Sequence, residues 1–224
     1  MRDVRIRFSK TGVAKYISHL DLMRCFSRAF VRAKIPLWYT EGFNPRPYLN
    51  FTSPLSLGVE GLRECVDIRV EGDITDGEIV ARLSAVMPPD IAIGSAAPPN
   101  HKMNAIEASR YAFTIEQHAV PAEELAEALR KNTERPHLPV YKMAKRGKEK
   151  VQKEIDLKEY LADFSAEAGE NGTVTVRVTL PSSPQFGVNP KLFIERFLTD
   201  TGTVPDRLRM VREELFVSDG QPFC

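Results

Sequence analysis

The stretch Val4-Arg5-Ile6-Arg7-Phe8, followed by Ser18-His19-Leu20-Asp21-Leu22-Met23-Arg24, decides the fold. Its first part alternates apolar and basic residues, which is the pattern of a strand with one buried face. Its second part places Ser18 three residues before Asp21, a spacing typical of a capped helix N-terminus. We therefore expect a strand followed by a helix.

Apolar residues after the Ser18 cap recur at three- and four-residue spacing, so we expect one face of this helix in the core. They are Leu20, Met23, Phe26, Phe30 and Ala33. The elements expected next are strands at 37–39 and 66–70, a helix that starts at a Thr75 cap, and a strand at 91–93. The order β-α-β-β-α-β is that of the ferredoxin-like sandwich, in which two helices cover one face of an antiparallel sheet.

The same order recurs after a linker expected at 94–108. Its expected elements are a strand at 111–115, a helix opened by Pro121, strands at 161–166 and 173–180, a helix capped by Asn189, and a strand at 208–217. A basic, hairpin-like stretch is inserted near 134–157. We predict an α+β protein of two tandem ferredoxin-like units with antiparallel sheets, at 1–97 and 109–224.

Composition excludes several classes of protein. A hydrophobic fraction of 42% is ordinary for a globular chain with a core. No apolar run approaches the ~20 residues that a membrane helix needs. The first residues alternate at once and lack the apolar centre of a signal peptide. We expect a cytoplasmic protein without membrane contact.

The cysteines and histidines show no ligand spacing. Cys25, Cys65 and Cys224 are far apart and odd in number, so we expect reduced thiols. No Cys-x-x-Cys pair occurs, and the four histidines are scattered. We therefore expect no metal and no cofactor.

The net charge of +1 conceals a strong polarity along the chain. Residues 1–50 hold ten Lys or Arg against three acids, whereas residues 60–90 hold eight acids against three bases. Such asymmetry indicates a directional field, which concerns partners more than the fold.

Arg24, Arg28 and Arg32 recur every four residues and line one side of the first helix. Parallel guanidinium forks suit phosphate oxygens, because each fork donates two hydrogen bonds. Lys10 and Lys15 lie near in the sequence and extend the expected anion-binding set. The alternative interpretation is an ordinary solvated helix surface.

The segment 40–47 contains two prolines and a glycine, which favours a stiff turn. Phe43 is a candidate for stacking on bases, and Arg46 for contact with a phosphate or base edge, with Asn44 between them. The alternative is that Phe43 packs into the core. Further along, Lys145, Arg146 and Lys148 indicate either non-specific contact with nucleic acid or plain solubility.

His19 is the one candidate for proton transfer in the first helix. A helix N-terminus disfavours the imidazolium, so we expect a neutral ring. General acid–base catalysis needs a second group at the reacting atom, and the sequence indicates none. A structural or ligand-orienting histidine is the competing interpretation, and we assign no catalytic residue beyond this candidate.

Four motifs resemble the family of radical-SAM-linked (radical-SAM-associated) proteins of unknown function. They are Phe8-Ser9-Lys10-Thr11-Gly12, Ile17 to Arg24, Glu41-Gly42-Phe43-Asn44-Pro45-Arg46-Pro47 and Leu55-Ser56-Leu57-Gly58-Val59-Glu60. The resemblance is specific over about residues 1–75 and looser to the end. It implies a bacterial protein encoded beside, or fused behind, a radical SAM protein with a cobalamin-binding region, in RNA or ribosome metabolism.

The resemblance implies an accessory role, since this chain lacks the Cys-x-x-x-Cys-x-x-Cys triplet of the radical SAM cluster. The first hypothesis is a non-catalytic module that presents tRNA or rRNA to a radical SAM enzyme encoded nearby. The second is a metal-independent endoribonuclease using His19, by analogy with CRISPR-type repeat-associated RNA-binding proteins of tandem ferredoxin-like architecture. The third is a protein–protein adaptor that docks the radical SAM partner through its acidic 60–90 region or its sheet surface.

Overall fold

The computed structural model describes residues 1–146 and 149–224, without the side chains of residues 143–151. The chain divides into two compact units, Met1–Glu107 with Val211–Cys224 (unit 1) and Ala108–Met210 (unit 2). The predicted division at 1–97 and 109–224 differs, because the last residues of the chain return to unit 1. None of the helices that the structure describes is both long and apolar enough to cross a bilayer.

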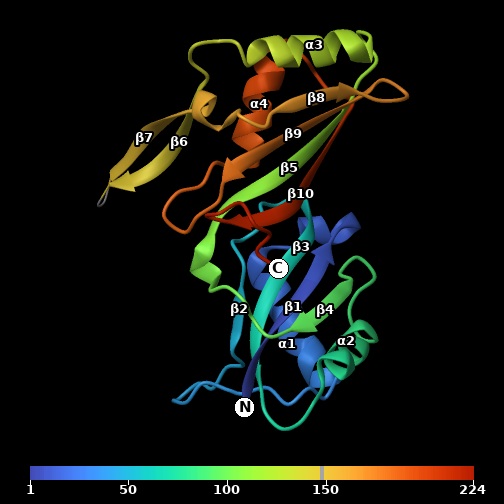
Figure 1. The fold of residues 1–224 in the computed structure, drawn as a ribbon, viewed down its shortest axis with the longest axis vertical. Helices are drawn as coiled ribbons and strands as arrows, with labels where there is room; N and C mark the ends of the chain where they lie inside the picture. The colour runs from blue at the N-terminus through green and yellow to red at the C-terminus, as the bar shows by residue number, and fades with distance from the viewer. Residues whose placement is uncertain (147–148) are drawn as a thin grey trace. The chain divides into compact units, whose positions relative to one another are not determined.

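Unit 1 is a sheet with two α-helices (Figure 1). Its elements are β1 (Arg2–Lys10), η1 (Gly12–Tyr16), α1 (His19–Arg32), β2 (Leu49–Phe51), β3 (Val59–Val70), α2 (Asp76–Ser84), β4 (Ile93–Ala97) and η2 (Met103–Ala105). The strand order is β4-β1-β3-β10, where β10 is Arg207–Val217 near the end of the chain, and the short β2 also pairs with β3. β1 runs antiparallel to β3 and β4, as β2 does to β3.

The register of β1 and β3 separates the two faces of this sheet. Val4 lies opposite Ile68, and both are fully buried in the core that α1 and α2 cover. The next pair along, Arg5 and Asp67, points to the other face because side chains alternate along a strand. The alternating pattern of the sequence thus sets the larger core on one face, and Cys65, Leu215 and Phe223 belong to a second, smaller cluster of buried residues.

Both helices of unit 1 start as their sequences predict. The Ser18 Oγ accepts a hydrogen bond from the Asp21 N–H at 3.1 Å. Thr75 and Glu78 form a capping box at α2, in which each side chain binds the other residue's backbone N–H. The predicted strand at 37–39 is wrong, because Leu37 and Tyr39 form only isolated bridges and the strand lies at β2 instead. Prolines at 36, 45 and 47 lack the N–H that a longer ladder needs.

Unit 2 carries its own sheet and helices. Its elements are most of β5 (Ile106–Glu116), α3 (Ala122–Asn132), β6 (Pro139–Arg146), β7 (Glu149–Asp156), η3 (Leu157–Tyr160), β8 (Ser165–Ala168), β9 (Thr173–Pro181), α4 (Pro190–Asp200) and the first residues of β10 (Arg207–Val217), which continues into unit 1 at Val211. The strand order is β10-β5-β9-β8, and β6 pairs with β7 as a separate antiparallel ribbon. That ribbon is the hairpin predicted near 134–157.

The core of unit 2 follows from the alternation in β9. Val174, Val176 and the other valine and leucine residues of β9 are fully buried, and the threonines between them are not. Phe193 and Phe197 of α4 stack at 4.8 Å between ring centroids. Asn189 caps α4 as predicted, since its Oδ1 accepts from the Lys191 N–H at 3.0 Å.

The predicted α+β class is confirmed, since the described residues form four α-helices and a mostly antiparallel sheet. The linker predicted at 94–108 is instead largely structured, because β4 extends to Ala97 and β5 starts at Ile106. The assignment of each unit as a ferredoxin-like sandwich stays a prediction.

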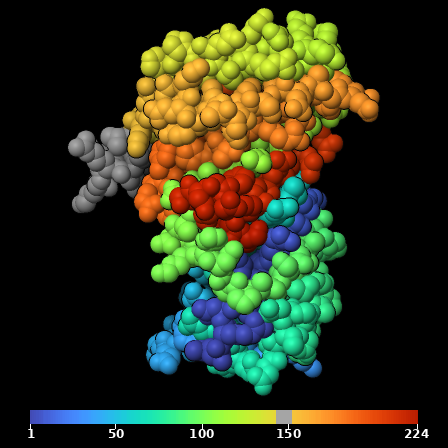
Figure 2. All heavy atoms as spheres, in the orientation of Figure 1, coloured from blue at the N-terminus to red at the C-terminus, as the bar shows by residue number. Residues whose placement is uncertain are grey.

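The expectation of three reduced thiols is wrong for two of them. A disulfide joins Cys65 of β3 to Cys224, and Cys25 alone is free. Nothing in the sequence indicated this pair, because 159 residues separate the two cysteines. They meet only because the C-terminal segment returns to unit 1. That segment, red in Figure 2, lies on the surface of unit 1. There the Phe223 ring packs 4.0 Å from the Arg5 guanidinium carbon and covers the Arg5–Asp67 ion pair.

Candidate nucleic-acid interface

The first turn of α1 sets the charge at one end of the interface. Asp21 accepts from the Ser18 hydroxyl at 2.7 Å and from the Arg24 guanidinium at 3.1 Å. These bonds, that of Ser18 before that of Arg24, lower the pKa of Asp21, so the carboxyl is ionised at neutral pH. Arg24 and Asp21 are both more than half exposed, so their ion pair is weak and open to exchange with another anion.

The buried face of α1 differs from the predicted one. Leu22, Phe26 and Phe30 are buried in the core of unit 1. Leu20, predicted in the core, is 55% exposed, and Met23 is only partly buried. Two apolar side chains of α1 therefore lie outside the core, beside the arginines.

The segment 40–47 is held as a closed loop beside α1. The Thr40 N–H donates to the Arg46 carbonyl at 2.9 Å, and the Arg46 N–H donates to the Thr40 hydroxyl at 3.1 Å. Tyr39 and Pro47 form a bridge at the base of the loop. Gly42 has a φ of +128°, which a residue with a Cβ rarely adopts. These bonds close the loop at its base, and the predicted stiffness of the turn stays a prediction.

Between α1 and this loop lies a groove of about 470 Å³, hereafter the arginine groove. Its lining residues are Leu20, Met23, Arg24, Ser27, Arg28, Arg46, Pro47 and Leu49. Three of the predicted arginines thus come together from two segments that are separate in the sequence. Among the residues that the structure describes, no carboxylate forms an ion pair with Arg28 or Arg46.

Arg32, the third arginine of the predicted stripe, has a different role. Its Nη2 donates to the Val86 carbonyl at 2.9 Å, just beyond the end of α2. A guanidinium on the last carbonyls of a helix satisfies groups that the helix itself leaves unpaired. Arg32 therefore joins two helices and does not line the arginine groove.

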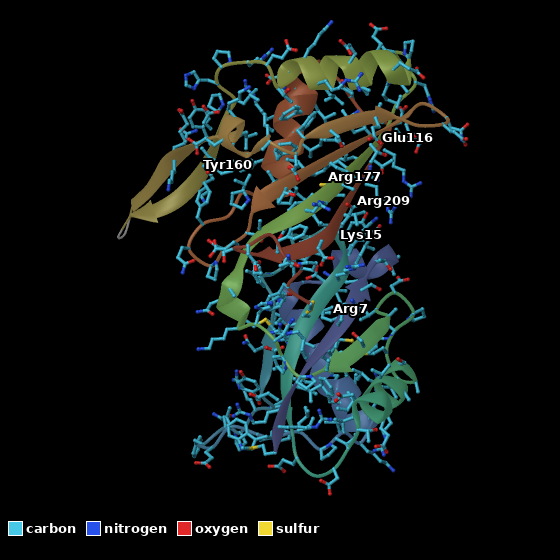
Figure 3. All side chains as sticks on the ribbon, viewed as in Figure 1. Arg7, Lys15, Glu116, Tyr160, Arg177 and Arg209 are labelled. Atoms are coloured by element: carbon cyan, nitrogen blue, oxygen red, sulfur yellow. A yellow bond between two sulfur atoms is a disulfide. The ribbon has the colours of Figure 1, made fainter. Side chains whose placement is uncertain are left out.

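Lys10 and Lys15, predicted to contact the anion, lie elsewhere. Lys10 is 1% exposed, and its Nζ donates to the Ile17 carbonyl at 3.0 Å. Burial lowers its pKa, against the smaller raising effect of the Glu64 charge. Lys15, labelled in Figure 3, pairs with the buried Glu60 at 3.1 Å. Neither lysine lines the groove, because Lys10 is buried and Lys15 is paired with a carboxylate.

Lys10 belongs to a second set of charges, the buried cluster of Lys10, Glu64 and Arg212. The Arg212 Nε donates to Glu64 Oε1 at 2.9 Å, and its Nη2 donates to the Ser53 carbonyl at 2.8 Å. The Thr52 hydroxyl donates to the other Glu64 oxygen at 3.3 Å. All three charged residues of the cluster are less than 5% exposed. Their charges satisfy one another and the backbone, so the cluster holds unit 1 together.

His19 lies at the edge of the buried cluster. Its ring meets Phe51 edge-on at 5.6 Å, and it lines a cavity of about 10 Å³ with Lys10 and Glu64. Burial, and then the charge of Lys10, lower the His19 pKa, which keeps the ring neutral at pH 7. A cavity of this size has room for about one water molecule. It does not admit a ribose 2′-hydroxyl together with its phosphate.

Of the two aromatic residues in and next to the loop, one is exposed to solvent and the other contacts a side chain of the protein. Phe43 is 100% exposed, so the alternative that it packs into the core is wrong. Asn44 is also exposed and lies outside the groove lining. Tyr48, next to the groove, is engaged elsewhere, since its ring lies 5.0 Å from the Arg69 guanidinium carbon. Phe43 is thus the aromatic side chain that the loop presents to solvent.

The basic residues of the β6–β7 hairpin are not placed. Lys145, Arg146 and Lys148 lie outside the residues whose side chains the structure describes. Elsewhere in unit 2, Arg177 of β9 and Arg209 of β10 appear on the sheet in Figure 3. Arg177 faces Glu167 at 3.8 Å, and Arg209 also has a partner. In the described part of unit 2, these two strand arginines are therefore engaged within the protein.

Sequence reasoning identified Arg24, Arg28 and Arg46 but missed the apolar floor of the groove. Leu20 and Met23 carry the helical spacing of core residues, and nothing local distinguishes them. Leu49 and Pro47 complete the floor from the far side of the loop. The sequence did contain one signal for this floor. The apolar residues of α1 are more numerous than one buried face of a helix can hold, so some of them must lie outside the core.

Comparison with known proteins identifies a family and little else. No protein with a curated description matches the chain. A solved structure described as a Cbf5-Nop10-Gar1 complex contains a similar chain, with a TM-score of 0.49 and 10% identity. The match covers 93% of this chain and 48% of that chain, so the present chain spans about half its length. Residues 3–190 match a family described as uncharacterized and conserved in bacteria, DUF2344. The chain therefore belongs to the DUF2344 family.

Proposed function

We propose that this protein is a non-catalytic RNA-binding module, whose arginine groove holds the RNA backbone. The observation that carries the proposal is the convergence of Arg24, Arg28 and Arg46 on one open groove. Phosphates are the anions that a row of guanidinium forks fits best. Asp21 offsets one of the three charges, and its exposed pair with Arg24 yields to a stronger anion.

The partner and pathway of the proposal rest on sequence motifs alone. The resemblance of residues 1–75 to radical-SAM-linked proteins supports a radical SAM enzyme of the cobalamin type as partner, and tRNA or rRNA as substrate. We also propose that each unit is a ferredoxin-like sandwich. The strand orders β4-β1-β3-β2 and β10-β5-β9-β8 support this, since each places the first and third strands of its unit in the centre.

The test is the salt dependence of RNA binding. Each phosphate contact contributes about 0.7 to the slope of log affinity against log salt for a single strand. The double substitution Arg24→Ala/Arg28→Ala should flatten the slope by about 1 to 2 and weaken binding most at low salt. Fluorescence anisotropy of a labelled transfer-RNA fragment between about 50 and 200 mM salt measures both quantities.

The matched control removes the same number of positive charges elsewhere. Arg82 and Lys131 are exposed helix residues, each in an i,i+4 pair with a glutamate. The Arg82→Ala/Lys131→Ala variant should keep the slope of the wild type. Equal effects of the two double variants, or binding that ignores salt, would refute the proposal.

The endoribonuclease alternative is tested separately. Incubation of the protein with total RNA and a chelator, followed by gel analysis, should leave the RNA intact. Cleavage that disappears in His19→Ala would replace the proposed module with an enzyme. The adaptor alternative predicts that the radical SAM partner is still captured after ribonuclease treatment, which a pull-down measures.

A further inference from the structure

The arginine groove has an apolar floor, which a contact with phosphate alone would leave unused. This floor consists of the four apolar lining residues, Leu20, Met23, Pro47 and Leu49, and Arg24, Arg28 and Arg46 also line the groove. An RNA backbone resting on the arginines alone would leave this surface in water. We propose that the groove seats one unpaired nucleotide, with its base on the apolar floor and its phosphate on the arginine rim. This inference rests on the proposed function.

The polar groups around the floor are already bound. Ser27 is the one uncharged polar side chain of the lining, and its hydroxyl donates to the Met23 carbonyl at 2.9 Å. On the loop side, the Arg46 N–H and carbonyl both bind Thr40, and the Tyr48 N–H binds the Trp38 carbonyl. The four apolar residues of the floor therefore offer the base an apolar contact, and their side chains carry no donor or acceptor for its edge. Such a site tolerates any of the four bases.

The volume and the charge limit what fits. The groove measures about 470 Å³, within the ~300–1,000 Å³ of small-ligand pockets. A paired base is stacked inside its helix and cannot reach the floor, whereas an extruded base can. An apolar peptide would leave the guanidinium groups without counter-charge. An unpaired nucleotide supplies both an aromatic face and an anion, which one ribose joins.

The wall of the groove is fixed before binding. The Thr40–Arg46 bonds and the Tyr39–Pro47 bridge close the loop without any ligand. A preformed wall loses little conformational entropy when a base enters. Phe43, fully exposed on the same loop, extends the aromatic surface available to the next base.

The experiment compares three labelled RNA hairpins that differ at one position, using the full chain. One hairpin is fully paired, one carries a single bulged adenosine, and one carries an abasic bulge. The adenosine bulge should bind about tenfold more tightly than either of the others, since stacking of one base supplies that much. The advantage should fall to near unity in Leu20→Gln, which makes the floor polar.

A control on the same helix separates the floor from helix polarity in general. Val31 is 66% exposed on α1 and does not line the groove. Val31→Gln should keep the tenfold preference. Salt-sensitive binding that is equal for all three hairpins would overturn the nucleotide pocket and leave the proposed function standing. A preference that survives Leu20→Gln would also overturn it. Absence of salt-sensitive binding to any hairpin would refute both.

Discussion

The arginine groove and the buried cluster of unit 1 both contain basic side chains, which are exposed in the groove and neutralised in the cluster. In the groove, Arg28 and Arg46 meet no carboxylate among the described residues, and their charges face open space. In the cluster, Lys10 and Arg212 surround one carboxylate, that of Glu64, away from water. In unit 1, a basic residue is thus available to a ligand where it is exposed and its pairing with an acid is absent or weak.

The largest effect is expected from the carboxylate of the buried cluster. Glu64→Gln leaves Arg212 and Lys10 buried without a counter-charge, which costs about 3 to 5 kcal/mol of unfolding free energy. Urea denaturation followed by circular dichroism measures the loss. Glu127→Gln removes an exposed carboxylate with two basic partners and should cost far less, because solvent screens surface ion pairs. Similar losses in the two variants would show that the cluster is no more structural than a surface pair.

The next effect concerns the disulfide that holds the C-terminal segment over Arg5 and Asp67. Its loop spans 159 residues, so Cys224→Ser should lower the free energy of unfolding by about 2 to 4 kcal/mol. A reductant should lower the stability of the wild type similarly and that of the variant no further. RNA binding at the groove should not change while the protein remains folded. Identical wild-type stability before and after reduction, with free thiols verified, would contradict this.

A smaller effect is a change in pH dependence at Lys10. Burial lowers the Lys10 pKa below 10.5, so between the folded and unfolded pKa values the unfolded chain binds the extra proton. Stability of the wild type relative to Lys10→Met should therefore rise as the pH increases toward 10.5. Urea denaturation of both proteins at increasing alkaline pH measures the difference. A constant difference would mean that Lys10 titrates alike in the folded and unfolded chain.

The smallest effect on stability is expected in the groove itself. Arg24→Ala/Arg28→Ala removes exposed charges, one of them in a weak surface pair, so unfolding should change by less than about 1 kcal/mol. Thermal denaturation beside the wild type measures it. A large loss of stability would mean that Arg24 and Arg28, like Arg32, hold helices together. The contrast between the groove and the buried cluster would then be wrong.

Local patterns predicted the elements well where one residue type decides them. Ser18, Thr75 and Asn189 start helices because their side chains bind the first free N–H groups. The threonine and valine alternation of β9 sets its buried face. The strand at 37–39 failed because prolines after it interrupt the ladder, which is a property of the pairing and not of the three residues.

The candidate site was predictable in part for the same reason. The spacing of Arg24 and Arg28 fixes them on one side of α1. No pattern in the sequence predicts that Arg46 lines the same groove as Arg24 and Arg28, or that Arg32 does not. Whether Lys10 faces water depends on β3 and β10, which lie far along the chain. Exposure of a charge is a property of all the segments that pack around it.

By itself, the sequence determined the α+β class, the capped helices, the turn at 40–47 and the concentration of positive charge in the first fifty residues. These depend on interactions between near neighbours, which residue type and spacing specify. Only the tertiary structure decided which arginines share a groove, which basic residues are neutralised in the interior, and that Cys65 meets Cys224. These depend on long-range packing, in which burial favours each charge that finds an opposite partner and leaves the others at the surface.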